Sequence, residues 1–303
     1  MWCCLFEVRV GLPVCGVCVW GYLCVGLPVC GAACVWGCLC VGLPVCGAAC
    51  VWRLCVAPHV ILIEMDSWHT VKLLTVFHSP PPQSSPFRHR PMRSCAVVGS
   101  GGILLNSCCG AEIDRADYVI RFNLPPMNYS YDIGRKSDMV TANPSILINK
   151  YSRLNARRRS FMDLVKMYEP AMILMPAFSY SMNTDVSYKA YYTLEDFRSQ
   201  QKVVYAHSHY LANLRRYWMK NGLKAPRLSS GLILVSAALE VCDKVTLYGF
   251  WPFPQGVDGN MITNHYYDNV PPKPGFHSMP DEFSFYAKMH SQGILRLKVG
   301  RCF

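Results

Sequence analysis

Two histidines near the end of the chain are the residues best suited to proton transfer. His265 opens the run His-Tyr-Tyr-Asp-Asn269, and His277 follows 12 positions later, after a proline-rich stretch at residues 271–274. His277 precedes Ser278-Met-Pro-Asp281, a pattern typical of a helix start with a capping serine. The positive end of a helix dipole disfavours imidazolium, so we expect a neutral ring that could act as a general base. A surface histidine without a role is the structural alternative.

A glycine-rich turn lies far upstream, between an expected strand and an expected helix. Gly99-Ser-Gly-Gly102 follows the apolar run Ala96–Val98. Glycines at such a turn let the backbone approach a phosphate or a ribose closely. Leu104 occupies the third glycine position of the dinucleotide fingerprint, so no dinucleotide site is predicted. A tight turn without a ligand is the alternative.

Two further side chains follow expected strands. Asn123 precedes Leu-Pro-Pro126, and its amide could donate and accept hydrogen bonds at the edge of a sugar or a base. An Asx-turn cap is the structural alternative for this residue. Trp251 follows the apolar run Val245–Tyr248 and could flank a ring of the ligand, although core packing is the commoner use of tryptophan.

A pair of serines opens a strongly apolar segment. Ser229 and Ser230 precede Gly231 and the run Leu232–Val241, which predicts a buried helix with a serine N-cap. The open amides of the first turn would also suit a phosphate or a sugar carboxylate. Taken together, these motifs suggest a transferase that moves a group off an activated nucleotide sugar without a metal ion.

Expected strands and helices alternate along residues 93–303. The expected strands are 96–98, 118–122, 139–142, 171–176, 203–205 and 245–248, and the expected helices are 103–116, 161–168, 210–221 and 232–241. This alternation predicts an α/β fold with a mostly parallel sheet flanked by helices. Ligands of such sheets bind at the carboxyl ends of the strands, which would place the glycine turn, Asn123 and the loop after Trp251 on one rim.

Residues 1–63 differ from the rest in composition. They contain 12 of the 17 cysteines and three charged residues, and the unit Gly-Leu-Pro-Val-Cys-Gly begins at positions 11, 26 and 42. A membrane anchor is one interpretation, but the repeated Leu-Pro and Gly would break a spanning helix. A soft-metal site is another, but histidines and clean cysteine pairs are missing. We therefore expect a low-complexity repeat, unstructured or produced by a faulty gene model, followed by a linker or stem at residues 64–92.

The net charge indicates the kind of ligand, and the remaining cysteines indicate the cellular compartment. The formal net charge of +11 fits an acidic ligand, and without a dense basic stripe interleaved with aromatic residues no nucleic-acid site is predicted. Five cysteines allow two pairs with one left over: Cys95, Cys108, Cys109, Cys242 and Cys302. The sequon Asn128-Tyr-Ser130 agrees with glycosylation in a secretory compartment. Five reduced cysteines in a cytosolic protein are the alternative.

Four segments, in this order, resemble the sialyl motifs of animal sialyltransferases. Cys95–Pro126 resembles the large motif, Leu228–Pro252 the small motif, His265–Asn269 the third motif, and His277 with Glu282 the very small motif. The resemblance covers about residues 93–303, the expected catalytic domain. The runs Val-Thr-Ala-Asn-Pro-Ser145 and Asn269-Val-Pro-Pro are most similar to the α-2,8-sialyltransferase branch.

The resemblance implies a fold and a set of residue roles. The fold would be a Rossmann-like variant of the GT-A glycosyltransferase type, which binds CMP-sialic acid with no metal and no cofactor. The implied donor-binding residues are Asn123, Ser100, Ser229, Ser230, Gly231 and Trp251. His277 would take the proton of the acceptor hydroxyl, and His265 would support the departing phosphate. The implied disulfides are Cys95–Cys242 and Cys109–Cys302, which leaves Cys108 as the odd thiol.

The implied reaction is an inverting transfer to the 8-hydroxyl of a terminal sialic acid on a glycolipid or a glycoprotein. The family's members are type II membrane proteins of the Golgi lumen, and a homodimer is compatible with the resemblance. The sequence departs from the family at three positions: Ser100 stands where many relatives have Asn, Ser230 where Thr is common, and Asn264 where a second His is frequent. The repeat replaces the usual basic tail, spanning helix and stem.

Two other functions explain part of the pattern. A nucleotide-dependent oxidoreductase or methyltransferase would share the glycine turn but leaves both histidines unexplained. A non-catalytic sialoglycan-binding relative would keep the fold without turnover, and the intact His265 and His277 argue against it.

Overall fold

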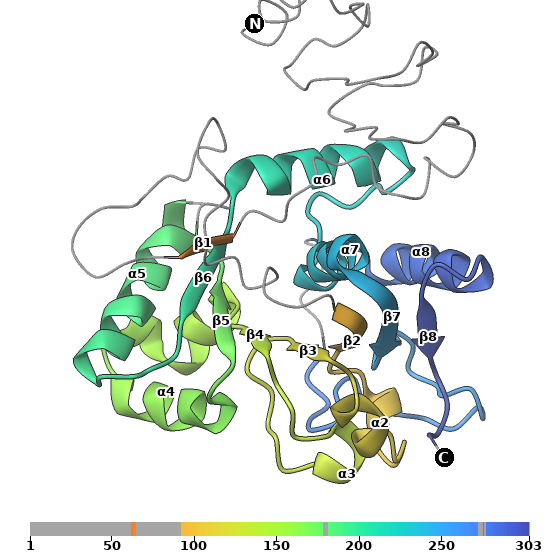
Figure 1. The fold of residues 1–303 in the computed structure, drawn as a ribbon, viewed down its shortest axis with the longest axis horizontal. Coiled ribbons are helices and arrows are strands. Elements are labelled where there is room, and N and C mark those ends of the chain that lie inside the picture. The colour runs from red at the N-terminus through yellow and green to blue at the C-terminus, as the bar shows by residue number, and fades with distance from the viewer. Residues whose placement is uncertain (1–61, 65–91, 178–180, 272–274, 276, 303) are drawn as a thin grey trace, which may run out of the picture. The chain divides into compact units, whose positions relative to one another are not determined.

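A twisted sheet of eight strands runs through the centre of the protein in the computed structural model, which describes residues 62–64, 92–177, 181–271, 275 and 277–302 (Figure 1). The strands are β1 (Leu62–Glu64), β2 (Met92–Val98), β3 (Tyr118–Arg121), β4 (Met139–Thr141), β5 (Met172–Met175), β6 (Val203–Ala206), β7 (Cys242–Tyr248) and β8 (Arg296–Lys298). Their order in the sheet is β1-β6-β5-β4-β3-β2-β7-β8. Strands β2 to β8 run parallel, and β1 is antiparallel to β6. The predicted α/β fold with a mostly parallel sheet is confirmed.

Helices cover both faces of this sheet. The α-helices are α2 (Gly110–Asp114), α3 (Ser130–Ile133), α4 (Arg158–Val165), α5 (Ser181–Asp196), α6 (Ser208–Lys220), α7 (Ser230–Val241) and α8 (Met279–Ser291). The short 3-10 and π turns are η2 (Gly102–Leu104), η3 (Ile146–Lys150), η4 (Ser152–Leu154) and η5 (Lys166–Tyr168). Figure 1 shows α6, α7 and α8 on one side of the sheet, and α2, α3 and α4 on the other.

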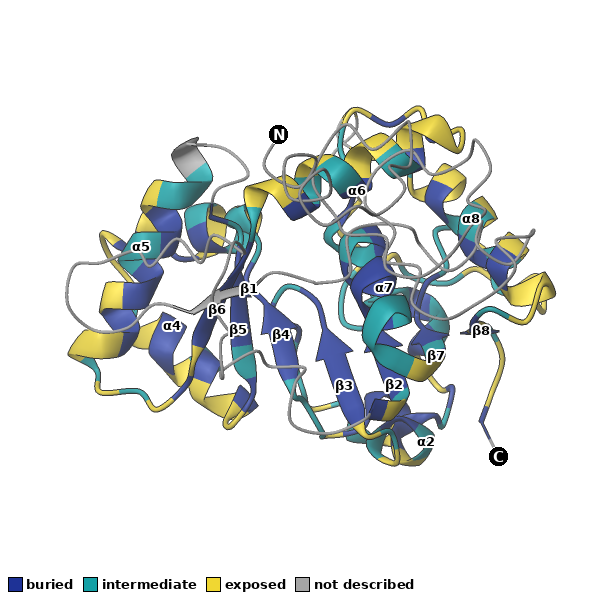
Figure 2. Ribbon diagram, turned by 45° about the horizontal axis from the view of Figure 1, so that its top comes forward, coloured by how far each residue is buried: buried dark blue, intermediate teal, exposed yellow. Residues whose placement is uncertain are grey.

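Side chains alternate between the two faces of the sheet along each strand, which shows that α2, α3, α4 and α5 cover the same face. Val119 of β3 packs in one core with residues of α2 and α3, and Val140 of β4 packs with residues of α4 and α5. Val140 pairs with Arg121, which lies two residues after Val119, so both valines point to the same face. Because both faces carry helices, the central strands β3 to β6 are almost wholly buried, as Figure 2 shows.

The order of the strands defines a switch point between β2 and β7. The strands β3, β4, β5 and β6 follow one another on one side of β2, and the next strand in the chain, β7, lies on the other side of β2. The loops after β2 and β7 therefore leave the sheet side by side at their carboxyl ends. This is where open parallel sheets bind their ligands.

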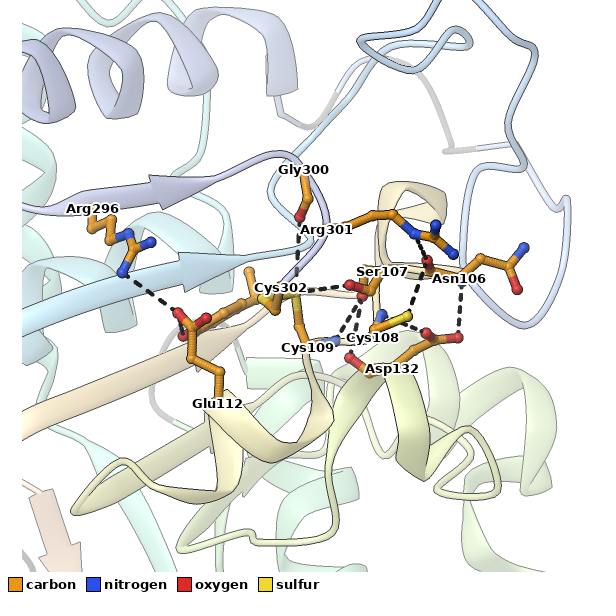
Figure 3. Close-up of a disulfide and its surroundings, with 11 residues drawn as sticks. Asn106, Ser107, Cys108, Cys109, Glu112, Asp132, Arg296, Gly300, Arg301 and Cys302 are labelled. Atoms are coloured by element: carbon orange, nitrogen blue, oxygen red, sulfur yellow. Dashed lines mark hydrogen bonds and ion pairs between the residues drawn. A yellow bond between two sulfur atoms is a disulfide. The ribbon is translucent and has the colours of Figure 1, made fainter.

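The continuous helix expected between residues 103 and 116 is wrong. The segment is broken into η2 and α2 by a turn in which Asn106 and Cys108 have left-handed backbone angles, with φ of 62° and 58°. The carboxylate of Asp132 accepts hydrogen bonds of 2.9 Å from the amides of both residues (Figure 3). Asp132 is more than 20 residues away in the sequence, so the local apolar pattern could not show this break.

Four strands and α-helices, and two short turns, lie outside the segments expected from the sequence. These are β1, α3, α5 and β8, with η3 and η4, and β1 spans the expected boundary between the repeat and the linker. The rest of both predictions, residues 1–61 and 65–91, lies outside the described residues. Among the residues that are described, no helix has the length and apolar character that crossing a membrane requires.

Two disulfides are present, with the pairing that the resemblance implies. Cys95 in β2 is bonded to Cys242 at the start of β7, and Cys109 before α2 is bonded to Cys302 near the carboxyl terminus. The two bonds join residues that are 147 and 193 positions apart. Cys108, next to the second disulfide in Figure 3, is the free cysteine of the described residues.

Candidate active site

The glycine turn after β2 packs against the loop after β7. A Cβ atom added at Gly99 or Gly101 would lie 2.8 or 2.5 Å from the carbonyl oxygen of Gly249, and one at Gly102 would lie 1.9 Å from that of Thr263. These distances are far below van der Waals contact, so each position requires glycine. Close packing of the chain's own backbone, as in the alternative of a tight turn, thus accounts for these glycines, and the approach of a ligand to the turn remains a prediction.

The loop that carries His265 is joined to this turn by its backbone. Gly101 and His265 form an antiparallel bridge, and the amide of Tyr266 donates to the carbonyl of Ser100 at 2.9 Å. The structure thus brings two predicted site residues, Ser100 and His265, to the same place. They come from segments more than 160 residues apart, and the sequence pattern gave no indication of a direct backbone contact.

The His265 ring is held by two neighbours. Its Nδ1 lies 2.6 Å from Oδ1 of Asp268, and its ring stacks on Tyr267 with centroids 5.1 Å apart. A carboxylate accepts, so Nδ1 carries the hydrogen and Nε2 is the ring atom available to a ligand. Burial raises the pKa of Asp268, but the hydrogen bonds from His265 and Val270 outweigh it and leave this pKa below its usual value. The Asp268 carboxylate thus fixes the tautomer and the orientation of the His265 ring.

A buried carboxyl group holds the start of α7. Ser229 is the N-cap, and its Oγ accepts from the amide of Leu232 at 3.0 Å. The same hydroxyl donates to Oε2 of Glu282, and the Ser229 amide donates to Oε1 at 2.9 Å. Glu282 comes from α8 and is fully buried. Burial raises the pKa of Glu282, against the opposing effect of the bonds from Ser229 and the nearby His277.

The serine N-cap predicted at Ser229 is confirmed, and it leaves part of the first turn of α7 open. The amides of Ser229 and Leu232 are occupied by Glu282 and by the capping hydroxyl. A phosphate at this helix would therefore have to meet the amides of Ser230 and Gly231. Gly231 is closely packed, because an added Cβ would be 3.1 Å from the ring of Phe250 and from Oγ of Ser229.

His277 lies beside the approach to the same helix. Its Nδ1 is 3.1 Å from the carbonyl oxygen of Arg227, two residues before the N-cap of α7, and its side chain is exposed. A carbonyl only accepts, so the hydrogen is on Nδ1 and Nε2 of the neutral ring has a free lone pair for a proton. Ser278 is the N-cap of α8 as predicted, but its side chain makes no capping bond. Pro280, Asp281 and Glu282 in the first turn are residues that favour a helix start.

Asn123 is connected to α7 through a residue that the sequence analysis did not single out as a site residue. Oδ1 of Asn123 accepts from the amide of Asn143 at 3.2 Å, and Nδ2 of Asn143 donates to Oγ of Ser230 at 3.4 Å. Thr141 accepts from the Asn123 amide and donates to the Asn143 side chain. Asn143 follows β4 as Asn123 follows β3, and this position at the carboxyl end of a parallel strand was the signal that could have found it.

Phe250 lies where the parts of the site meet. Its ring is edge-on to Phe122, just before Asn123, with centroids 5.9 Å apart, and edge-on to Tyr286 of α8 at 5.2 Å. The Cβ positions of Gly99 and Gly231 approach the same ring to 3.3 and 3.1 Å. The glycine turn, the end of β3, α7 and α8 thus converge on one aromatic side chain. No sequence pattern had indicated Phe250.

Trp251 and Asn128 are the last two of the predicted residues. The Trp251 indole donates to the carbonyl of Gln255 at 2.7 Å and packs edge-on to Phe253 and Phe283. Its ring is therefore in contact with protein, and a role beside a ligand remains a prediction. Asn128 is exposed in the extended segment before α3, and its glycosylation also remains a prediction.

Comparison with protein families shows what this chain resembles. The sequence model of glycosyltransferase family 29 (sialyltransferase) matches residues 61–294. Among solved structures, a crystal structure of a mammalian sialyltransferase is similar with a TM-score of 0.50 and 22% sequence identity, over 69% of this chain and 70% of the other. This likeness concerns the fold.

Several curated proteins are similar in sequence over 223 residues, which is 73% of this chain. They are alpha-2,8-sialyltransferase 8E of Rattus norvegicus at 51% identity, alpha-2,8-sialyltransferase 8F of Mus musculus at 47%, and an alpha-N-acetylneuraminide alpha-2,8-sialyltransferase of Xenopus tropicalis at 45%. The match spans 59%, 56% and 64% of the length of these three relatives.

Proposed function

Because the chain belongs to glycosyltransferase family 29, the sialyltransferases, we propose that it transfers sialic acid from CMP-sialic acid to the 8-hydroxyl of a terminal sialic acid. Identities of 45–51% with proteins named as alpha-2,8-sialyltransferases support this linkage. The helix-covered parallel sheet and its switch point between β2 and β7 support the Rossmann-like GT-A variant as the fold type.

The observation that carries the proposal is the setting of His277. With Nδ1 bonded to the Arg227 carbonyl, Nε2 of the neutral ring can accept a proton at the start of α7. The acceptor hydroxyl gives that proton to Nε2 while its oxygen attacks the anomeric carbon of the donor from the face opposite the phosphate. The bond between this carbon and the phosphate oxygen breaks, and the configuration inverts.

The departing phosphate takes the electron pair of the broken bond and needs positive charge or hydrogen-bond donors nearby. His265 is suited to this task because Asp268 holds the ring through Nδ1 and leaves Nε2 free, so that a proton carried on Nε2 would be donated to the phosphate. The amides of Ser230 and Gly231 at the start of α7 would add to this effect. Asn123, Ser100 and Trp251 would hold the rest of the donor.

We place the reaction in the lumen of the Golgi apparatus, with the chain as a type II membrane protein. The two disulfides support this compartment, because such bonds persist where the environment is oxidising. The exposed sequon asparagine, Asn128, is accessible to glycosylation in the same compartment.

The test replaces His277 by alanine in the full chain, produced in a secretory host. We expect the rate of transfer from labelled CMP-sialic acid to a sialylated acceptor to fall by about 10²–10⁴-fold with an unchanged melting temperature, because the base is lost. Full activity in His277→Ala would reject this base. A wild-type chain that binds sialylated glycans without any transfer would instead favour a non-catalytic relative.

The matched control is His290→Ala. His290 lies near the other end of α8, and its Nδ1 faces the carbonyl of Leu295 at 3.4 Å, so it has the same kind of bond in the same helix. Its replacement should leave the transfer rate unchanged. A large loss in this variant would indicate that α8, rather than the His277 ring, is responsible for the effect.

A further inference from the structure

The free cysteine beside the second disulfide belongs to a tripeptide with the spacing of a glycosylation sequon. In Asn106-Ser-Cys108 a short side chain with a polar hydrogen follows two residues after an asparagine, and no proline lies between them. In the usual sequon this third residue is a serine or a threonine. A thiol is a weaker hydrogen-bond donor on a side chain of the same length as serine. Only a reduced cysteine could take this place, because a disulfide removes the hydrogen.

The structure leaves the Cys108 thiol in this reduced form. Both disulfides are formed by other cysteines, although one of them includes the next residue, Cys109. The Cys108 side chain is half-buried, and its Sγ donates a long hydrogen bond of 3.8 Å to the carbonyl oxygen of Asn106. The third position of the tripeptide therefore keeps the polar hydrogen that a sequon requires.

Asn106 is exposed and is held by its backbone alone. Its amide donates to the Asp132 carboxylate at 2.9 Å, and its carbonyl accepts from Nε of Arg301 at 3.0 Å. Within the described ranges the side-chain amide of Asn106 makes no hydrogen bond, and Figure 3 shows it pointing away from the disulfide. A bulky group on Nδ2 would therefore extend into solvent without displacing a contact of the described residues.

A purely structural reason for this asparagine also exists. Its φ of 62° lies in the left-handed region, where asparagine is one of the favoured residues. This conformation explains the residue type at position 106, but it does not involve the side-chain amide. Cys108, with φ of 58°, has the same backbone conformation, and cysteine is not favoured there.

We propose that Asn106 is a glycosylation site of this chain, with Cys108 in the place of the usual serine or threonine. Nδ2 of Asn106 loses one proton and bonds to the anomeric carbon of an oligosaccharide carried on a lipid diphosphate. The bond between this carbon and the diphosphate oxygen breaks, and the lipid diphosphate leaves with its electron pair. The inference rests on the secretory location in the proposed function, because that compartment supplies the lipid-linked donor.

The test maps glycans on the full chain produced in an animal secretory host. Trypsin separates the two asparagines, because Asn106 lies in the peptide that ends at Arg115 and Asn128 in the one that ends at Arg135. Removal of an N-linked glycan by peptide N-glycosidase converts the asparagine to aspartate, which mass spectrometry detects. We expect Asn106 to be modified in a minority of the molecules, since a thiol is the weaker donor.

Substitutions at the third position give the sharper comparison. Cys108→Ser should raise the modified fraction of Asn106 severalfold, because it restores a hydroxyl, whereas Cys108→Ala should abolish the modification. Neither variant changes a disulfide-bonded cysteine. Asn106→Gly, which suits the left-handed backbone, removes the acceptor nitrogen and should give the same gel mobility as Cys108→Ala. Asn128 is the internal reference, and its modified fraction should be the same in all variants.

An unmodified Asn106 beside a modified Asn128 would overturn the inference, and so would a modified fraction that Cys108→Ala leaves unchanged. If neither asparagine carries a glycan, the secretory location is contradicted and the inference with it. Transfer from labelled CMP-sialic acid by the same preparation tests the proposed activity separately. A glycan on Asn106 in a chain without transfer would contradict that activity and leave the glycosylation site supported.

Discussion

Glu282 shows how one buried side chain can join two helices at a site. It leaves α8 one turn after His277 and accepts two hydrogen bonds from Ser229, the N-cap of α7. Tyr286, one turn further along α8, also donates to it at 3.4 Å. The position of the His277 ring relative to the first turn of α7 therefore depends on this carboxyl group. Glu282 is a positioning residue in this account.

We expect Glu282→Ala to lower the free energy of unfolding by about 3 kcal/mol, because it leaves the buried amide and hydroxyl of Ser229 without their acceptor. The transfer rate should also fall, since both helix starts lose their common contact. Glu282→Gln, which keeps one acceptor oxygen, should recover part of both losses. Urea unfolding and initial-rate measurements would check this.

Asp281→Ala is the control, because Asp281 is exposed in the same helical turn. An equal loss of stability in the two variants would contradict the role given to Glu282.

At the scale of elements, the far end of α7 contains a second buried carboxyl group. Glu240 accepts a long hydrogen bond of 3.4 Å from the hydroxyl of Tyr210 in α6, and its Oε2 is buried without a partner in the part of the chain that the structure describes. Burial raises the pKa of Glu240 to about 8, and the bond from Tyr210 opposes this only in part. The contact between α6 and α7 therefore depends on the protonation of Glu240.

The contribution of Glu240 to stability should consequently decrease with rising pH. In the unfolded chain Glu240 ionises near pH 4.5, whereas in the folded protein it keeps its proton until about pH 8. Glu240 binds more protons in the folded state between these values, so its contribution to stability is greatest below pH 4.5 and falls by at most about 1.4 kcal/mol per pH unit up to pH 8. Above pH 8 this contribution is lost.

Glu240→Gln should remove this slope, because an amide of the same shape stays neutral. Melting temperatures measured from pH 5 to pH 8 should converge at the acidic end and show the variant as more stable at pH 8. Tyr210→Phe should keep the slope, since burial is the larger cause of the shift. Parallel curves for the wild type and Glu240→Gln would show that Glu240 is not the titrating group.

At the scale of the whole molecule, the two disulfides connect parts that the chain separates. One joins neighbouring strands β2 and β7, and the other fixes the carboxyl terminus next to the turn before α2. They close loops of 147 and 193 residues. Each loop is large, so each bond restricts the unfolded chain strongly.

We expect the double variant Cys109→Ser, Cys302→Ser to lose about 5 kcal/mol of stability, from the chain entropy of a loop of this size. Chemical denaturation would measure this loss. Cys108→Ser is the matched control, because Cys108 is the neighbouring cysteine with a free thiol. If the control lost as much stability as the double variant, packing of the sulfur atoms rather than the covalent link would be responsible.

The sequence by itself determined the class of fold and most of the strands. Apolar runs such as Val203–Tyr205 and Val245–Tyr248 predicted strands correctly, because strands covered by helices on both faces are rich in apolar residues. It also placed the helix starts at Ser229 and Ser278, since serine and proline act on their own local backbone. The motif resemblance, together with these elements, identified the family before any contact was known.

Only the tertiary structure decided how these pieces meet. Glu282, Asp132, Asn143 and Phe250 act through partners that are distant in the chain, and no local pattern records such a partner. The same reason explains the break at Asn106 and the filled space at the glycine turn, where Gly249 and Thr263 approach from elsewhere. Local sequence patterns determine the secondary structure of each segment, whereas burial and hydrogen bonds between distant segments determine which of them form the site.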